Sequence, residues 1–138
     1  MLKLEYFFAC DFAFLAKGEK QSVIGIFQRI GYPAENIPTP INPFIYQPGF
    51  YVVGRASGVE KGEYVLALKM ESPSGQEVVL GTGTIKVAGN SAEGMGGNIA
   101  LPVIAPKFFE SGKHLIKLAI NDQALNPPIE IYVAEKSS

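Results

Sequence analysis

Short apolar stretches with a period of two recur along the whole chain, and this spacing constrains the fold more than any other feature. In the clearest stretch, residues 64–71, one face would carry Tyr64, Leu66, Leu68 and Met70, and the other Val65, Ala67, Lys69 and Glu71. Such alternation is typical of strands that have one face in a core. Its repetition about every ten residues, with Gly, Pro, Asn and Ser between the stretches, predicts an all-β, antiparallel sandwich.

The same punctuation divides the chain into about eight expected strands, at residues 3–15, 22–31, 50–57, 63–71, 77–87, 98–103, 113–121 and 129–134. The first strand is expected to bury its even positions: Leu4, Tyr6, Phe8, Cys10, Phe12 and Phe14. At most one short helical turn is expected, at residues 105–110. Residues 1–138 are expected to form a single domain, with 135–138 as a frayed tail.

The hairpin between residues 63–71 and 77–87 gives the most specific expectation of register. A turn centred near Pro73–Ser74 would place Leu68 opposite Val79 and Leu66 opposite Gly81. Glycine inside a strand usually marks a bulge or a large side chain that packs over it. Either is expected at Gly81 and Gly83.

Five prolines lie between residues 33 and 48, which excludes a regular central strand there. This segment is interpreted as a stiff connection that crosses from one sheet to the other. With connections at alternate ends of a sandwich, residues 33–48, 72–75 and 104–112 should share one end, and the Gly-rich residues 88–97 should lie at the other.

The first of these ends carries four aromatic residues, Phe44, Tyr46, Phe108 and Phe109. Rigid aromatic side chains lose little entropy on binding, which suits a protein-binding surface. Two interpretations stay open: a binding surface centred on Phe44 and Tyr46, or a set of rings that plugs the open end of the core.

Composition excludes several classes of partner. The net charge of −1 and the scattered Lys and Arg residues give no electrostatic reason to expect nucleic acid or an anionic membrane. No stretch approaches the roughly twenty apolar residues of a membrane helix. Cys10 is the only cysteine, so an intrachain disulfide is impossible. A soluble, cytoplasmic protein is expected.

No catalytic or metal-binding constellation is visible. Cys10 and His114 are the only nucleophile and base of the Cys–His type, and they are expected to be a buried thiol and a half-exposed residue at a strand end. One His, one Cys and two Asp are too few for a typical zinc or calcium site. Neither of the Gly-rich segments 81–84 and 94–97 is followed by the Gly-Lys-Ser/Thr of a phosphate-binding loop. We therefore expect no enzyme activity, no cofactor and no metal.

Asp11 is the one odd charge of the first strand, because it lies between Cys10 and Phe12 in an otherwise apolar stretch. A half-buried carboxylate needs a partner. Arg29 and Arg55 also lie inside apolar strands, so a structural ion pair between Asp11 and one of them is expected.

Two segments carry a resemblance to known proteins. Residues 4–13, which contain Cys10-Asp11, followed by Gly25-Ile26-Phe27 and Ile30, resemble the opening of a family of small uncharacterised bacterial proteins. Residues 62–75 and 112–122 look like the G-x-Y hairpins of immunoglobulin-like domains. The resemblance covers most of the chain and implies an immunoglobulin-like sandwich of unknown function, with no catalytic residues to carry over. The Trp and the Cys pair of antibody domains are absent.

Three functions remain open after these exclusions. The first is a non-enzymatic protein-binding or scaffolding module. The second is a homo-oligomeric structural subunit that pairs through its edge strands. The third is a small-ligand-binding protein with a pocket under the Pro-rich residues 33–48. The expected partner is another protein or a second copy of the chain.

Overall fold

The computed structural model describes residues 2–16, 20–87 and 98–136. These residues form an all-β fold with eleven strands and one 3₁₀ turn, η1 (Ala34–Asn36). The strands are β1 (Lys3–Ala16), β2 (Lys20–Phe27), β3 (Arg29–Tyr32), β4 (Phe44–Ile45), β5 (Phe50–Ser57), β6 (Gly62–Glu71), β7 (Glu77–Val87), β8 (Asn98–Val103), β9 (Lys107–Phe108), β10 (Gly112–Ile120) and β11 (Gln123–Glu135).

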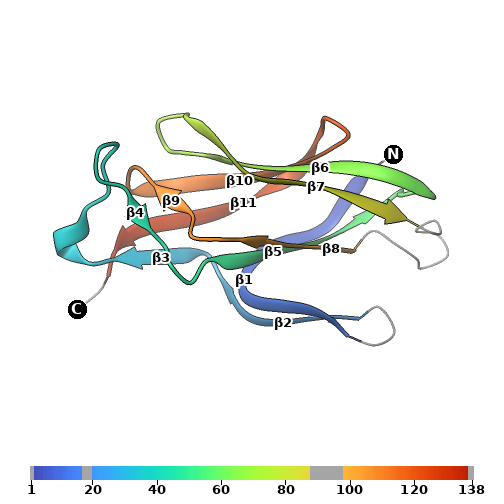
Figure 1. The fold of residues 1–138 in the computed structure, drawn as a ribbon, viewed down its shortest axis with the longest axis horizontal. Helices are drawn as coiled ribbons and strands as arrows, with labels where there is room; N and C mark the ends of the chain where they lie inside the picture. The colour runs from blue at the N-terminus through green and yellow to red at the C-terminus, as the bar shows by residue number, and fades with distance from the viewer. Residues whose placement is uncertain (1, 17–19, 88–97, 137–138) are drawn as a thin grey trace.

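Two main sheets lie one above the other in Figure 1. Sheet A has the order β2-β1-β5-β8, and sheet B has the order β3-β11-β10-β6-β7. All pairs are antiparallel except β3 and β11, so the expectation of a purely antiparallel fold is wrong at that edge. The core between the sheets is aliphatic, and its fully buried members include Val52, Leu66, Leu68, Ile116, Leu118 and Ile131.

The strand count exceeds the predicted eight for identifiable reasons. The expected strand at 22–31 breaks at Gln28, whose carbonyl accepts a hydrogen bond from the Tyr132 amide at 2.8 Å. The chain therefore leaves sheet A after β2 and joins sheet B as β3. The expected helical turn at 105–110 does not form, because Lys107 and Phe108 pair with β4 instead.

The Pro-rich residues 33–48 connect β3 of sheet B with β5 of sheet A, so the predicted crossing between sheets is confirmed. They lie at the same end as the β6–β7 turn and residues 104–112 (Figure 1). At that end the Ser74 hydroxyl donates a hydrogen bond to Glu110. The Gly-rich residues 88–97 fall outside the described residues.

A bulge corrects the predicted register of β6 and β7. Leu68 lies opposite Gly81 and Leu66 opposite Gly83, with a register shift between Leu68 and Lys69. The predicted pairing of Leu68 with Val79 is wrong because Lys69 takes that position. The expected bulge is confirmed next to Gly81, whereas Gly83 is regularly paired. No side chain packs over them, since a Cβ atom at Gly81 or Gly83 would meet nothing within 4 Å.

A second register shift corrects the buried face predicted for β1. It falls between Leu4 and Tyr6 in the pairing with β5. A shift of one residue exchanges the two faces of a strand. Leu4, before the shift, is buried as predicted, and Ala9, after it, belongs to the central core. Cys10 is also buried as predicted, whereas Tyr6, Phe12 and Phe14 are exposed.

The C-terminus is ordered further than predicted. Glu135 ends β11, and the Lys136 amide donates to the Tyr32 carbonyl at 2.9 Å. The prediction of a frayed tail from residue 135 is therefore wrong for Glu135 and Lys136. Residues 137–138 lie outside the described part of the chain.

Candidate functional site

The four aromatic residues predicted as a binding surface pack against the core. Phe108 is fully buried, and Phe44, Tyr46 and Phe109 are half-buried. Phe44 pairs with Phe108 across β4 and β9. The Phe44 ring lies 6.1 Å from that of Tyr32, and the Tyr46 ring 6.4 Å from that of Phe50, measured between centroids. The plug interpretation accounts for these contacts.

The predicted ion pair of Asp11 with Arg29 or Arg55 is absent from the described residues. Arg55 pairs instead with Glu5, with Nε 3.0 Å from Oε2, and Arg29 donates to the Glu135 carbonyl at 3.2 Å. The physical reason is placement. Arg55 lies opposite Tyr6, five positions before Asp11 on β1, and Arg29 belongs to the other sheet.

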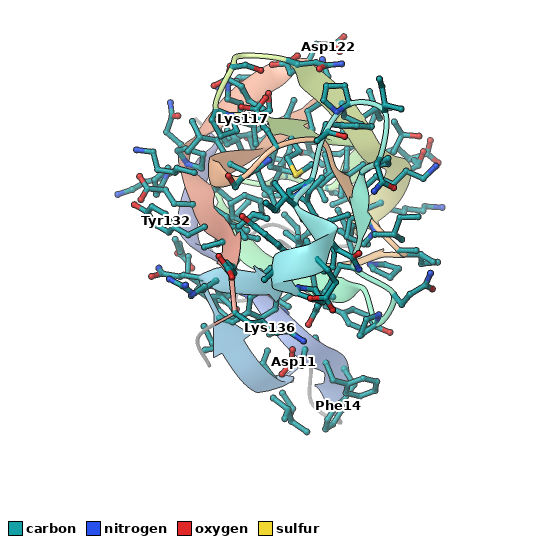
Figure 2. The ribbon with its side chains drawn as sticks, turned by 90° about the vertical axis from the view of Figure 1, so that its left-hand side faces the viewer. Asp11, Phe14, Lys117, Asp122, Tyr132 and Lys136 are labelled. Atoms are coloured by element: carbon teal, nitrogen blue, oxygen red, sulfur yellow. The ribbon has the colours of Figure 1, made fainter. Side chains whose placement is uncertain are left out.

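Asp11 itself is exposed on the β1–β2 hairpin (Figure 2). It lies against Gly25, where the backbone has a φ of +72° and a Cβ atom would strike the Asp11 carboxylate. Glycine is required here by both its conformation and its neighbour.

Cys10 and His114 do not form a catalytic pair: Cys10 packs in the small cluster with Ala13 and Val53, and His114 of sheet B packs against Phe108. Cys10 is buried as predicted, and burial raises the pKa of its thiol. A thiol with a raised pKa is a poor nucleophile.

His114 is not the half-exposed residue that was predicted, since only 1% of its surface is exposed. It continues the buried face of β10, and the Phe108 ring covers it edge-on at 5.2 Å between centroids. Its Nδ1 lies 3.0 Å from the Gly112 carbonyl, while its Nε2 has no hydrogen-bond partner. Burial lowers the pKa of this imidazole.

The described part of the chain offers neither a metal site nor a membrane-spanning helix. No group of three or more His, Cys, Asp or Glu side chains there could hold a metal ion. No helix among those residues is long and apolar enough to cross a membrane.

The largest unexpected feature is an apolar surface on the β1–β2 hairpin, which extends below both sheets in Figure 1. Phe12 and Phe14 are each 47% exposed, Ile24 61% and Ile26 60%. The register places Phe12 opposite Ile24 and Cys10 opposite Ile26, so the four side chains share one face. The two phenyl rings lie 6.0 Å apart. We call these four residues the hairpin face; Phe14 is labelled in Figure 2.

The pairing of β1 explains why this face is uncovered. Residues Lys3 to Cys10 pair with β5, whereas residues Ala9 to Ala16 pair with β2, and the two sets overlap only at Ala9 and Cys10. The hairpin is therefore almost a separate two-stranded ribbon. On its opposite face, Ala13 is buried in a small cluster that includes Val53 of β5. Cys10 shares the face of Phe12 but is fully buried where the ribbon begins.

The exposed area of the hairpin face is large, even though the Tyr51 ring packs edge-on against Phe12 at 5.5 Å between centroids. A Phe side chain can bury roughly 200 Å², so two half-exposed rings leave roughly 200 Å² of apolar surface. The two isoleucines bring the face to a few hundred Å², the size at which exposed apolar patches often mark interaction sites.

Comparison with known proteins adds one match. A family model described as "Family of unknown function (DUF6941)" matches residues 5–134. The chain belongs to the DUF6941 family. The match runs from β1 almost to the end of β11, so it includes the hairpin and both sheets. Comparisons with curated proteins and with solved structures found no match.

Proposed function

We propose that this DUF6941 protein is a non-enzymatic protein-binding module whose binding surface is the hairpin face. The observation that carries the proposal is the exposure of Phe12, Phe14, Ile24 and Ile26 on one face of a ribbon. The surface lies away from the loop end favoured by the sequence.

Physical features of the hairpin support this role. Phe side chains have few rotatable bonds, so their immobilisation in an interface costs little entropy. The covered face of the ribbon holds it against β5 through Ala13. A partner that covers the exposed face would remove a few hundred Å² of apolar surface from water.

Other parts of the proposal rest on the sequence. A non-enzymatic role is favoured by the separation of Cys10 from His114. We keep the immunoglobulin-like class, the bacterial source and the cytoplasmic location as proposals. The net charge of −1 favours a protein partner over nucleic acid or membrane.

Capture of partners by the immobilised protein from native lysate tests the proposal. The variant Phe12→Ser/Ile24→Ser disrupts the hairpin face. The matched control Val65→Ser/Val79→Ser changes two apolar residues of sheet B that are 56% and 58% exposed. We expect the control to retain a bound protein that the hairpin variant loses, with both variants folded by circular dichroism. Equal capture by the two variants would contradict the proposal.

A second candidate function, self-association through an edge strand, is favoured by the composition of β2. This strand is an edge of sheet A, and it carries no charge after Lys20. Natural edge strands usually carry a charge or a proline that blocks pairing. The edge strand β8 has Pro102, and the edge strand β7 has Lys86.

Sedimentation over a range of concentrations tests this second candidate. Pairing through β2 predicts a dimer that Ile24→Lys dissociates, because the lysine places a charge on the edge. A monomer at every concentration excludes it.

A further inference from the structure

A cavity of about 210 Å³ lies where the edge of sheet A faces sheet B. Leu66 and Ile85 line it from sheet B, and Ile99 and Leu101 line it from the edge strand β8. The hairpin contributes Ala13 and Phe14. Asn98 is the only polar residue among the described residues that line it.

Gly83 lies next to two of the residues that line the cavity, Leu66 across the strand pair and Ile85 along β7. Gly83 lies opposite Leu66 and two residues before Ile85, so all three share the face of sheet B that lines the cavity. A Cβ atom at Gly83 would meet nothing within 4 Å, and its φ is not positive. Neither crowding nor backbone conformation therefore requires glycine. Because glycine weakens a strand interior, its effect here is to leave the space open.

The cavity is partly open to solvent, and its lining is mostly apolar. An apolar occupant would remove that lining from water, which favours binding. An apolar cavity of about 150 Å³ can bind benzene, so one of about 210 Å³ matches a chain of roughly eight carbons.

The polar rim of the cavity indicates the head group of such a chain. The Asn98 side-chain oxygen accepts a hydrogen bond from Arg55 Nη1 at 2.8 Å. The Arg55 side chain is 25% exposed and pairs through Nε with Glu5, so a guanidinium that already binds one carboxylate lies beside the one polar lining residue and is accessible from water. Arginine matches the planar geometry of a carboxylate.

We propose that this cavity binds a medium-chain carboxylate, with the alkyl chain between β8 and sheet B and the carboxylate at Arg55 and Asn98. The site is independent of the proposed protein-binding role, although Phe14 contributes to both surfaces.

Calorimetric titration of the whole protein with single-chain carboxylates, from butanoate to dodecanoate and below their micellar concentrations, tests the site. We expect each added methylene to tighten Kd about fourfold until the chain reaches about eight carbons, and no further gain beyond. Octanol tests the head group: octanoate should bind more tightly than octanol, and Arg55→Gln should remove that difference.

Two variants of β7 provide a matched pair. Gly83→Val fills the cavity and should weaken octanoate binding by about tenfold to a hundredfold. Gly81→Val is on the same strand and face and has equally open space, but it lies opposite Leu68, which does not line the cavity, so it should bind like wild type. If Gly83→Val does not fold, Ala100→Leu fills the cavity from an exposed position on β8.

Three results would overturn the proposal. These are octanoate binding that Gly83→Val or Ala100→Leu leaves unchanged in a folded protein, an affinity that rises steadily to dodecanoate, and no saturable binding at all. Equal affinities for octanoate and octanol would overturn the assignment of the carboxylate to Arg55. None of these variants alters Phe12 or Ile24. Failure of the carboxylate proposal would therefore leave the lysate experiment on the hairpin face unaffected.

Discussion

Phe108 is the residue whose removal best tests whether the rings at the loop end belong to the core. Its side chain is fully buried, and burial of a Phe ring removes roughly 200 Å² from water. At about 25 cal/mol per Å², this burial contributes about 5 kcal/mol. Alanine would still bury its Cβ atom, so the substitution loses somewhat less than the whole amount. We therefore expect Phe108→Ala to lower the free energy of unfolding by about 3–5 kcal/mol.

Urea denaturation followed by circular dichroism measures this loss. The midpoint should fall while the slope of the transition stays the same, because the area exposed on unfolding hardly changes. In a thermal scan, the same loss corresponds to a decrease in Tm of about 6–20 °C for a domain of this size.

Ile104→Ala provides the control, because Ile104 lies at the same end and is 85% exposed. Its substitution should change the free energy of unfolding by about 0.5 kcal/mol or less. A loss of less than about 1 kcal/mol for Phe108→Ala would refute the plug interpretation and restore the ring as a free binding element.

Three further predictions concern single residues. Burial lowers the pKa of His114 from 6.5, so the stability that comes from burying the neutral imidazole should be complete above pH 6.5 and lost as the pH falls from 6.5 towards the folded-state pKa. The urea midpoint should therefore decrease over this pH range, and His114→Leu should reduce that decrease. Gly25→Ala should cost about 1–2 kcal/mol from its left-handed backbone, and more from contact with Asp11, by urea denaturation. The buried Cys10 thiol, whose pKa is raised, should react with a thiol reagent only as fast as the protein unfolds.

Each of these predictions has an internal check. His114 is the only histidine, so one imidazole resonance in a proton NMR titration reports its pKa, and a value at or above 6.5 would contradict the buried assignment. Asp11→Ala should recover part of the loss in Gly25→Ala, and strictly additive losses would mean that the two side chains do not interact. Rapid labelling of Cys10 in the folded protein would show that its strand opens locally.

The fold class could be predicted from the sequence because it depends on local patterns. Alternation specified most strands, and Gly and Pro marked most of their ends. The turn between β10 and β11 is an example, since Asn121 and Asp122 both adopt the positive φ that such residues tolerate in tight hairpins. The Asn121 side chain also accepts a hydrogen bond from the Val65 amide, which ties this turn to β6.

The errors arise where one residue changes the register. The shift between Leu4 and Tyr6 exchanged the faces of β1, and the bulge near Leu68 moved the pairing of β6 with β7. Neither shift has a distinctive local sequence. The burial of His114 depends on the Phe108 ring from β9, a contact between segments that no periodicity connects.

The hairpin face follows from a mismatch between the composition of β1 and its surroundings. From Tyr6 to Phe14 this strand is apolar at nearly every position on both faces, which is typical of a strand covered on both sides. The first half of β1 is covered on the face that carries Leu4 and Ala9, because both side chains enter the core. Its second half keeps the same composition after the pairing with β5 has ended at Cys10.

A ribbon that served only to connect strands would be more stable in water with Thr or Lys on its outer face. Phe12, Phe14, Ile24 and Ile26 instead retain the composition of a buried strand without a cover. Local conflicts of this kind between a sequence and its environment tend to occur at functional sites. A bound partner would resolve the conflict by supplying the cover, which is the physical basis for placing the function of this protein on the hairpin.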